Sequence, residues 1–159
     1  MAVEPQSRLL DLLEINLALN SIDAYQVVHE AVSDVDYVTL SLSAEGNTGG
    51  SSIVRKYRWG GKEERVPVYT VERLAESCGV DRIDFVKVDV EGFEPEVVRS
   101  LHPLLDNRRV GKVLVDYHVS ILWDRGITAE SVHEGIAEPG YMALLGSLAG
   151  GYVYYGRSR

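Results

Sequence analysis

The sequence predicts an open α/β sheet in which helices cross over between parallel strands. Segments with apolar residues at helical spacing alternate along the chain with short runs rich in valine, isoleucine and tyrosine, and this alternation is typical of such a sheet. A chain of 159 residues, of which 45% are hydrophobic, can bury one sizeable core. We therefore expect a single domain over residues 1–159.

The first half of the chain is expected to contain one helix followed by strands. Leucines at helical spacing predict an amphipathic helix over residues 6–19. Residues 25–32 have the apolar composition of a buried strand, and residues 36–43 alternate polar and apolar side chains as a half-exposed strand does. The glycine-rich residues 44–52 predict a loop, and residues 53–59 predict an irregular strand-like segment.

The second half is expected to alternate helices with strands. Thr70 and Thr128 are suitable N-caps, Gly79 suits the position just after a helix end, and Pro95 suits the first turn of a helix. The expected elements are a helix over 70–79, a strand over 83–90, a helix over 95–105, a strand over 112–119, a helix over 129–138, and two strands around a turn within 141–155.

Charge and composition argue against several classes of partner. The formal net charge is −8 and the sequence has no dense basic run, so we expect no nucleic-acid partner. The most apolar segment, residues 141–155, is too short to cross a bilayer, so we expect no membrane partner. The single cysteine, Cys78, cannot form an internal disulfide, and the first residues lack a signal-peptide pattern. These features predict a cytoplasmic protein.

Charged residues gather around the end of one predicted strand. Lys87, Asp89 and Glu91 alternate with valines, which would place all three on one face of an extended strand. If the next strand pairs beside it, Asp116 and His118 reach the same rim, where ligands of open α/β sheets bind. Each residue alone could serve only as a structural ion pair or a solvated strand end. Taken together, they favour a functional site.

The order of three motifs points to a known family. KVDVEGFE at residues 87–94 follows an apolar strand, and TVERL at residues 70–74 opens the helix before it. Near the start of the chain, an EP pair at residues 4–5 precedes a predicted helix that contains Asn16 and Asn20. In this order the motifs resemble the FkbM-type S-adenosylmethionine-dependent methyltransferases, over roughly residues 2–119.

The resemblance implies a fold, a cofactor and a reaction. It implies a Rossmann-like class I methyltransferase fold with a mostly parallel sheet, S-adenosylmethionine as cofactor, and methyl transfer to a hydroxyl group on a small molecule or sugar. It also implies that Glu4 bonds the ribose hydroxyls of the cofactor and that Ala31 and Val32 lie near the adenine. The candidates for catalysis are Lys87, Asp89, Glu91 and His118. Which of the last three acts as the base stays open.

Several alternatives remain open. In the family a first strand with a glycine-rich turn and its helix precede Glu4, so we expect an N-terminally truncated domain. The alternative function is therefore a non-catalytic or truncated remnant that acts as a binding protein. A nucleotide-binding oxidoreductase fits the α/β order but lacks its fingerprint. Asp89, Glu91 and His118 could also hold a divalent cation, but Lys87 would repel it, so we favour metal-free catalysis.

Overall fold

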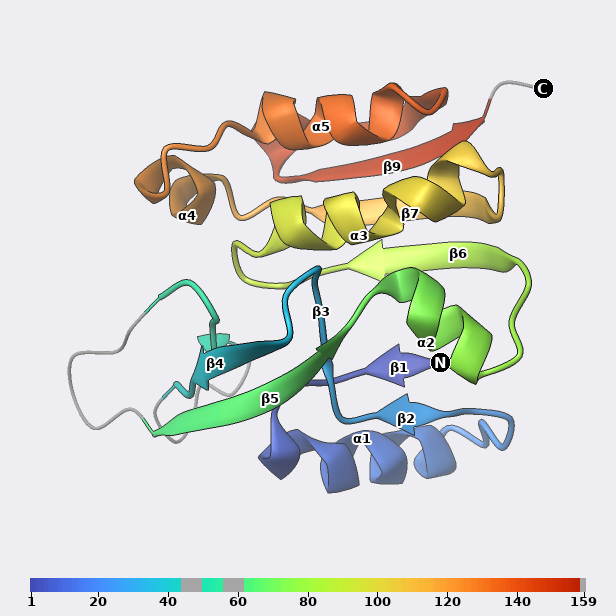
Figure 1. Ribbon diagram of the computed structural model, residues 1–159, viewed down its shortest axis with the longest axis vertical. Helices are drawn as coiled ribbons and strands as arrows, with labels where there is room; N and C mark the ends of the chain where they lie inside the picture. Colours follow the sequence, from blue (N-terminus) through green and yellow to red (C-terminus); the bar gives the residue numbers. More distant parts are fainter. Residues whose placement is uncertain (44–49, 56–61, 158–159) are drawn as a thin grey trace. The chain divides into compact units, whose positions relative to one another are not determined.

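The chain forms two structural units, which are described separately. The computed structural model describes residues 1–43, 50–55 and 62–157, and the units are Met1–Tyr69 and Thr70–Arg159. Figure 1 shows their helices and strands. Most of the glycine-rich loop expected at 44–52, and part of the irregular segment expected at 53–59, lie outside the described residues. The expectation of one domain over residues 1–159 stays a prediction.

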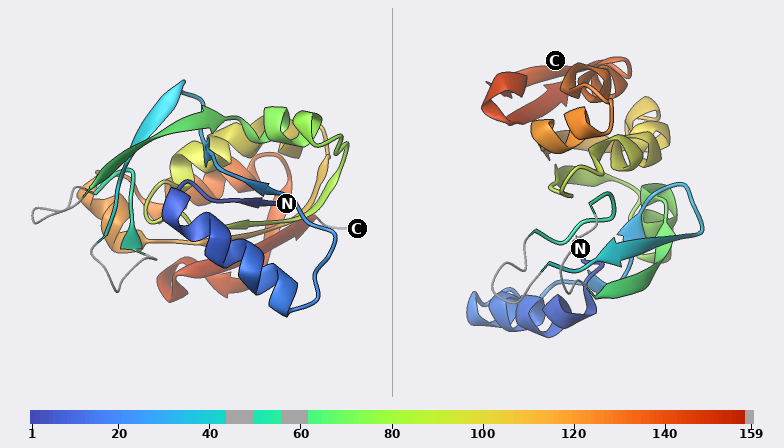
Figure 2. Two further views of the ribbon diagram at one scale, coloured as in Figure 1. Left: turned by 90° about the horizontal axis from the view of Figure 1, so that it is seen from below. Right: turned by 90° about the vertical axis from the view of Figure 1, so that its left-hand side faces the viewer.

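The first unit contains one helix and two small sheets. A two-stranded parallel sheet pairs β1 with β2, and in a second sheet β5 lies between β3 and β4, parallel to β3 and antiparallel to β4. The β4–β5 ribbon can be followed in Figure 2. The elements are β1 (Ala2–Val3), α1 (Ser7–Leu19), β2 (Val27–Val28), β3 (Ala31–Val32), β4 (Tyr37–Ser41) and β5 (Glu63–Tyr69).

Two features of this unit differ from the sequence-based prediction. The strand expected over residues 25–32 is split, because β2 pairs with β1 whereas β3 pairs with β5. Strand β5 was not predicted, since its charged residues and Pro67 are uncommon in strands. Pro67 pairs with Tyr37 at one end of β4, and the pairing of β5 with β3 begins only at the next residue. The missing amide hydrogen of proline therefore lies at the end of the β4–β5 ladder and just before the β3–β5 ladder.

The second unit is a four-stranded mixed sheet with helices. The strand order is β6-β7-β9-β8, in which β6 and β7 are parallel and β9 is antiparallel to both of its neighbours. The elements are α2 (Val71–Ser77), β6 (Ile83–Val88), α3 (Glu94–Asp106), β7 (Val110–Asp116), α4 (Val119–Asp124), α5 (Ala129–Ala137), β8 (Tyr141–Ser147), a 3-10 helix (Leu148–Gly150) and β9 (Tyr152–Arg157).

The local start signals of these helices are confirmed. The Thr70 and Thr128 hydroxyls accept hydrogen bonds from the backbone amides of Arg73 and Ser131, both at 3.2 Å, as N-caps do. Pro95 lies in the first turn of α3, where its lack of an amide hydrogen leaves no helical bond unmade.

The expectation of a mostly parallel sheet is not confirmed. Parallel and antiparallel pairs both occur in the two larger sheets. In the second unit, the 3-10 turn between β8 and β9 reverses the chain within a few residues, with Gly151 at φ +81° just after it. So short a connection can join only antiparallel strands, because a parallel pair needs a crossover of a dozen residues or more. The observed architecture is mixed α/β.

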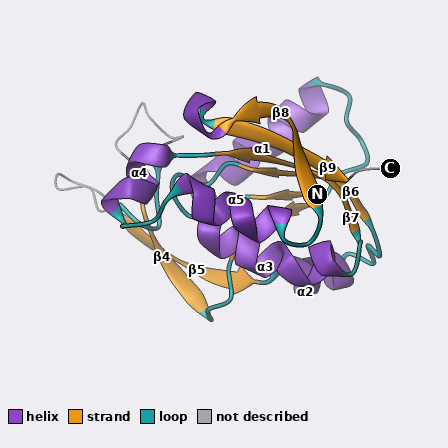
Figure 3. Ribbon diagram, turned by 90° about the horizontal axis from the view of Figure 1, so that it is seen from above, coloured by secondary structure: helices purple, strands orange, loops and turns teal. Residues whose placement is uncertain are grey.

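The core of the second unit lies between the sheet and the pair α3 and α5. Both helices contact the sheet, and Figure 3 shows them side by side. Fully buried side chains come from both layers, and Gly135 of α5 lets the helices approach, since a Cβ there would lie 3.1 Å from Val98 Cγ1. The most deeply buried core residues include Leu101, Leu105, Val113, Val115, Ile136 and Tyr155. This core fixes the ends of β6 and β7.

Candidate functional site

The segment that follows β6 is a tight turn and not an extension of the strand. β6 ends at Val88, and Glu91 and Gly92 both have positive φ angles, +50° and +93°. Left-handed backbone of this kind reverses the chain, and α3 begins at Glu94. The expectation that Lys87, Asp89 and Glu91 share one face of a strand is therefore wrong, because only Lys87 lies within β6.

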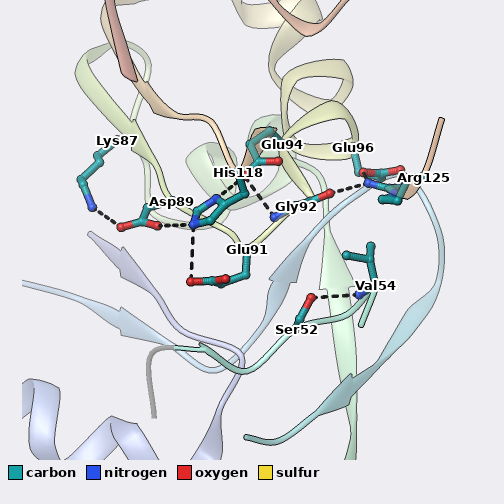
Figure 4. Close-up of polar contacts among 10 residues, drawn as sticks. All are labelled: Ser52, Val54, Lys87, Asp89, Glu91, Gly92, Glu94, Glu96, His118 and Arg125. Atoms are coloured by element: carbon teal, nitrogen blue, oxygen red, sulfur yellow. Dashed lines mark hydrogen bonds and ion pairs between the residues drawn. The ribbon is translucent and has the colours of Figure 1, made fainter. Parts of the chain in front are cut away.

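His118 nevertheless meets these acidic residues. β7 is the parallel neighbour of β6, with Val88 in register with Val115, so the segments after both strands leave the sheet at the same end. His118 follows β7 as the N-cap residue of α4. Its Nε2 lies 3.4 Å from Glu91 Oε1 and 3.8 Å from Asp89 Oδ1. Figure 4 shows the imidazole facing both carboxylates. The structure therefore brings these three residues together.

Two further predicted members of the cluster have different positions. Lys87 Nζ donates to Asp89 Oδ2 at 2.6 Å, and both side chains are about half exposed. This is the ion pair that the simpler interpretation of the sequence expected. Asp116 ends β7 in register with Tyr152, and its side chain makes no hydrogen bond or ion pair with any other described residue. It therefore does not join the group around His118.

Glu94 is the partner of His118 that the sequence did not identify. The side chain of Glu94 is 0% exposed, and its Oε1 lies 2.7 Å from His118 Nδ1. The same oxygen accepts a hydrogen bond from the Gly92 backbone amide at 3.1 Å. Its second oxygen, Oε2, is buried and has no hydrogen-bond partner within residues 1–43, 50–55 and 62–157. The signal available in the sequence was its place as the last residue of the motif KVDVEGFE, which assigns it no partner.

The electrostatic surroundings favour the protonated form of His118. The pKa of His118 is raised above its ordinary value of 6.5, mainly by the hydrogen bond to Glu94. Partial burial opposes this shift, and the negative charges of Glu91, Glu94 and Asp89 add to it. A neutral imidazole, which can accept a proton, is therefore formed at a higher pH than for a histidine in water.

Arg125 holds the turn from the other side. This residue follows α4, and its guanidinium donates to the Gly92 carbonyl oxygen. It also binds both carboxylate oxygens of Glu96, at 3.2 and 2.7 Å. Planar two-point pairing of this type has a fixed geometry. Arg125 was not identified from the sequence, since no local pattern marks it.

The described contacts determine what the imidazole can do. Because the Glu94 carboxylate oxygen can only accept a hydrogen bond, we assign a hydrogen to Nδ1 of His118, which donates it to Glu94. In the neutral ring, Nε2 then carries the lone pair, on the side where Asp89 and Glu91 lie. The His118 side chain is 21% exposed, so Nε2 can meet a ligand. Such an imidazole can take a proton from a hydroxyl group and hold it as an imidazolium.

In the first unit, Glu4 follows β1 directly. Its Oε1 accepts a hydrogen bond from the Gln6 backbone amide at 2.8 Å. The pKa of Glu4 is raised, mainly because burial disfavours the charged carboxylate, and the charge of Glu64 adds to this effect. The Gln6 amide and His29 oppose the shift. Its second oxygen, Oε2, has no polar partner among the residues that the structure describes.

A polar cluster fixes the chain just after Glu4. Gln6 is buried, and its Oε1 accepts from Arg8 Nη2 at 3.1 Å and from Ser51 Oγ at 2.8 Å. Arg8 Nη2 also donates to the Ser43 carbonyl oxygen at 3.2 Å. The position of the Gln6 amide, which orients Glu4, is therefore set by side chains far along the sequence.

The other predicted cofactor residues lie on a different sheet of the same unit. Ala31, 3% exposed, and the partly exposed Val32 form the whole of β3, which pairs with β5. Glu4 follows β1, whose partner is β2. Val32 ends its strand, as the sequence predicted.

The structure provides no evidence for a metal cluster or a membrane helix in its described part. Among residues 1–43, 50–55 and 62–157, no three or more histidine, cysteine, aspartate or glutamate side chains are arranged to bind a metal ion. Over the same residues, none of the helices has the length and apolar character needed to cross a bilayer.

Comparison with known proteins gives one positive result. The family model described as the methyltransferase FkbM domain matches residues 1–134. No curated protein and no solved structure matches the chain significantly. The family match includes all the candidate residues from Glu4 to His118 and most of the chain. The chain therefore belongs to the FkbM methyltransferase domain family.

Proposed function

We propose that this chain catalyses methyl transfer from S-adenosylmethionine to a hydroxyl group of a small molecule or sugar, with His118 as the general base. The family match supports a methyltransferase. The single observation that carries the catalytic assignment is the position of His118 between the buried Glu94 and the pair Asp89 and Glu91. The proposal includes a Rossmann-like class I arrangement of the complete fold.

The residues of the first unit fit a role in binding the cofactor. Glu4 offers a partly buried acceptor oxygen, Oε2, that has no polar partner within the described residues, and a vicinal diol such as ribose needs such an acceptor. In the proposal, Glu4 accepts from the ribose hydroxyls and the end of β3 at Ala31 and Val32 lies against the adenine. When bound, S-adenosylmethionine supplies the methyl group as an electrophile on a sulfonium sulfur.

His118 removes the proton of the acceptor in this scheme. The hydroxyl proton would pass to Nε2 while the hydroxyl oxygen bonds to the methyl carbon, and the bond between that carbon and the sulfonium sulfur would break, leaving its electron pair on sulfur. The resulting imidazolium is stabilised by the hydrogen bond to Glu94 and by the charges of Glu91 and Asp89. General base catalysis of this kind contributes about 10² to 10⁴ in rate. Lys87 balances the charge of Asp89 through its ion pair.

Isotope transfer tests the proposed reaction. The protein is incubated with S-adenosylmethionine that carries a ¹³C-labelled methyl group and with a panel of sugars and other hydroxylated small molecules. We expect the label to appear on an acceptor oxygen, which NMR of the product distinguishes from a methylated nitrogen or carbon. Cofactor binding without transfer to any acceptor would favour the alternative, a non-catalytic binding protein, and transfer to nitrogen alone would contradict the assignment of the acceptor.

A further inference from the structure

The buried environment of Glu94 disfavours a charged side chain unless that charge interacts with a partner. The side chain is 0% exposed, and Oε2 makes no hydrogen bond within the described part of the chain. Burial of a carboxylate disfavours folding unless partners compensate its charge. A neutral glutamine would accept the same Gly92 hydrogen bond at lower cost. A structural role at the start of α3 therefore does not account for an acid at this position.

We propose that Glu94 is a positioning residue that fixes the ring orientation and the tautomer of His118 for methyl transfer. This inference rests on the proposed function, because it assigns to Glu94 an action through the base. It adds a residue to the site that neither the family match nor the charge pattern of the sequence assigns.

The geometry links the ring to the turn through one atom. Glu94 Oε1 accepts from the Gly92 amide at 3.1 Å and lies 2.7 Å from His118 Nδ1. The acceptor is thus held by the backbone of the turn that also carries Glu91. Since Nδ1 is engaged, the ring can rotate only by breaking this contact, and Nε2 stays on the side of Asp89 and Glu91.

The charged groups around the ring set the expected effect on its titration. Asp89 and Glu91 face Nε2 from the turn, and Glu94 faces Nδ1 from α3. Lys87 partly neutralises Asp89, and Arg125 binds the Gly92 carbonyl oxygen and not the ring. Because the Glu94 hydrogen bond is the largest contribution to the raised pKa of His118, its removal should lower that pKa more than the removal of Glu91 does.

The first test uses histidine NMR and does not depend on activity. The protein is labelled with ¹⁵N in the imidazole rings of its four histidines, and the His118 signals are assigned by their loss in His118→Asn. We expect neutral His118 to carry its hydrogen on Nδ1. In Glu94→Gln the titration midpoint should fall toward 6.5, and by more than in Glu91→Gln. A midpoint that stays at the wild-type value in a folded Glu94→Gln variant would overturn the proposal.

A control variant tests whether the loss of any acid at a helix start has the same effect, and a second variant at Glu94 is available if Glu94→Gln does not fold. Glu130 is an exposed acid in the first turn of α5 and is not among the groups that shift the pKa of His118. Glu130→Gln therefore removes a charge at a helix start and should leave the His118 midpoint unchanged. If Glu94→Gln does not fold, Glu94→Asp retains the charge but is too short to reach both partners, and its His118 midpoint should also fall. An unchanged midpoint in that variant would refute the proposal equally.

Enzyme kinetics provide a second test of the role of Glu94. With an acceptor identified, the pH–rate midpoint of Glu94→Gln should fall together with the NMR midpoint. The limiting kcat at high pH should drop about 10-fold to 100-fold, since a weaker base transfers the proton less readily, and KM should stay unchanged. A change in KM alone would contradict the positioning role. If no acceptor is methylated, the proposed function fails, while the NMR result still shows whether Glu94 fixes the tautomer and raises the pKa of His118.

Discussion

Glu4 and Glu94 are oriented by the same kind of hydrogen bond but have different side chains around them. Each carboxylate accepts a hydrogen bond from a backbone amide two residues away, Gln6 for Glu4 and Gly92 for Glu94. Glu94 also binds a titratable partner, His118, at 2.7 Å. Among the described residues Glu4 has no titratable partner at such a distance, and burial raises its pKa. A backbone hydrogen bond orients a carboxylate, but the side chains around it decide its chemistry.

The difference assigns the two acids to different tasks. The Glu94 carboxylate contacts His118, so it acts on another residue of the chain. Glu4 keeps an oxygen, Oε2, for which the described residues provide no donor, so it is suited to a ligand that brings hydroxyl groups. Substitutions in the two regions should therefore separate cofactor binding from turnover.

The largest effect is expected at His118. Replacement by asparagine, which is similar in shape but cannot take up the proton, should lower kcat by about 10² to 10⁴ because the general base is lost. The affinity for S-adenosylmethionine should change less than about threefold. Steady-state kinetics and calorimetric titration check both values. His102→Asn is the control, because His102 lies on α3 and pairs with Asp106 instead. A variant His118→Asn with wild-type kcat would remove His118 from the mechanism.

The next effect is expected at Glu4 and has the opposite distribution. Glu4→Gln should weaken S-adenosylmethionine binding by about 10-fold to 100-fold, the equivalent of one hydrogen bond to a charged group. The kcat at saturating cofactor should change little. Glu14→Gln, an exposed acid on α1, serves as the control. Calorimetric titration measures the affinities, and equal losses in kcat for Glu4→Gln and His118→Asn would abolish the distinction between the two regions.

Glu4→Gln should also affect the stability of the folded protein. Because the folded-state pKa of Glu4 is raised, its contribution to stability is fully present below 4.5 and is lost as the pH rises through the raised value. At pH 7 the buried charge is therefore unfavourable to folding. Glu4→Gln should melt at the same temperature as the wild type or higher, as thermal unfolding can verify, and a clear decrease would mean that Glu4 has a stabilising partner.

A smaller effect is expected from Arg125. Arg125→Gln should lower the free energy of unfolding by about 1.5 kcal/mol, because a hydrogen-bonded ion pair with Glu96 and a bond to the Gly92 carbonyl oxygen are lost. Urea denaturation measures the change. Arg99 pairs with the same Glu96 at 3.4 Å but is about half exposed, so Arg99→Gln should cost less than about 0.5 kcal/mol. Equal losses in the two variants would show that the bond to the turn adds no stability.

The smallest effect is expected from chelation. EDTA should leave the rate of methyl transfer unchanged, because the positive charge of Lys87 lies against Asp89, where a divalent cation would have to bind. A rate that falls with EDTA and returns with magnesium would instead make Asp89 and Glu91 metal ligands. That result would also weaken the comparison of the two regions, since the second would then bind a ligand as the first is proposed to do.

Local chemistry was predictable from the sequence. The N-caps at Thr70 and Thr128 and the proline at the start of α3 depend on residues only a few positions apart, and each lies where the pattern indicated. The parallel pairing of β6 with β7 also followed from the alternation of strands and a helix. This pairing brought His118 to the acidic turn.

Contacts between distant segments were not predictable. Glu94 and His118 are 24 positions apart, and their contact requires both the early end of β6 and the placement of His118 beyond β7. Alternating valines indicated a longer strand, because the pattern cannot show that Glu91 and Gly92 adopt left-handed backbone. Strand β5 was missed for a similar reason, since its pairing with two neighbours outweighs the weak strand preference of its residues.

The left-handed backbone of Glu91 places stability and activity in conflict. A side chain at φ +50° costs about 1 kcal/mol relative to glycine, which adopts this conformation freely. A library of variants at this position, sorted only for resistance to heat, should therefore be enriched in glycine and asparagine. A library sorted for methyl transfer should retain the acid that faces Nε2 of His118. Different residues recovered by the two selections would show that folding and methyl transfer place opposite demands on this position.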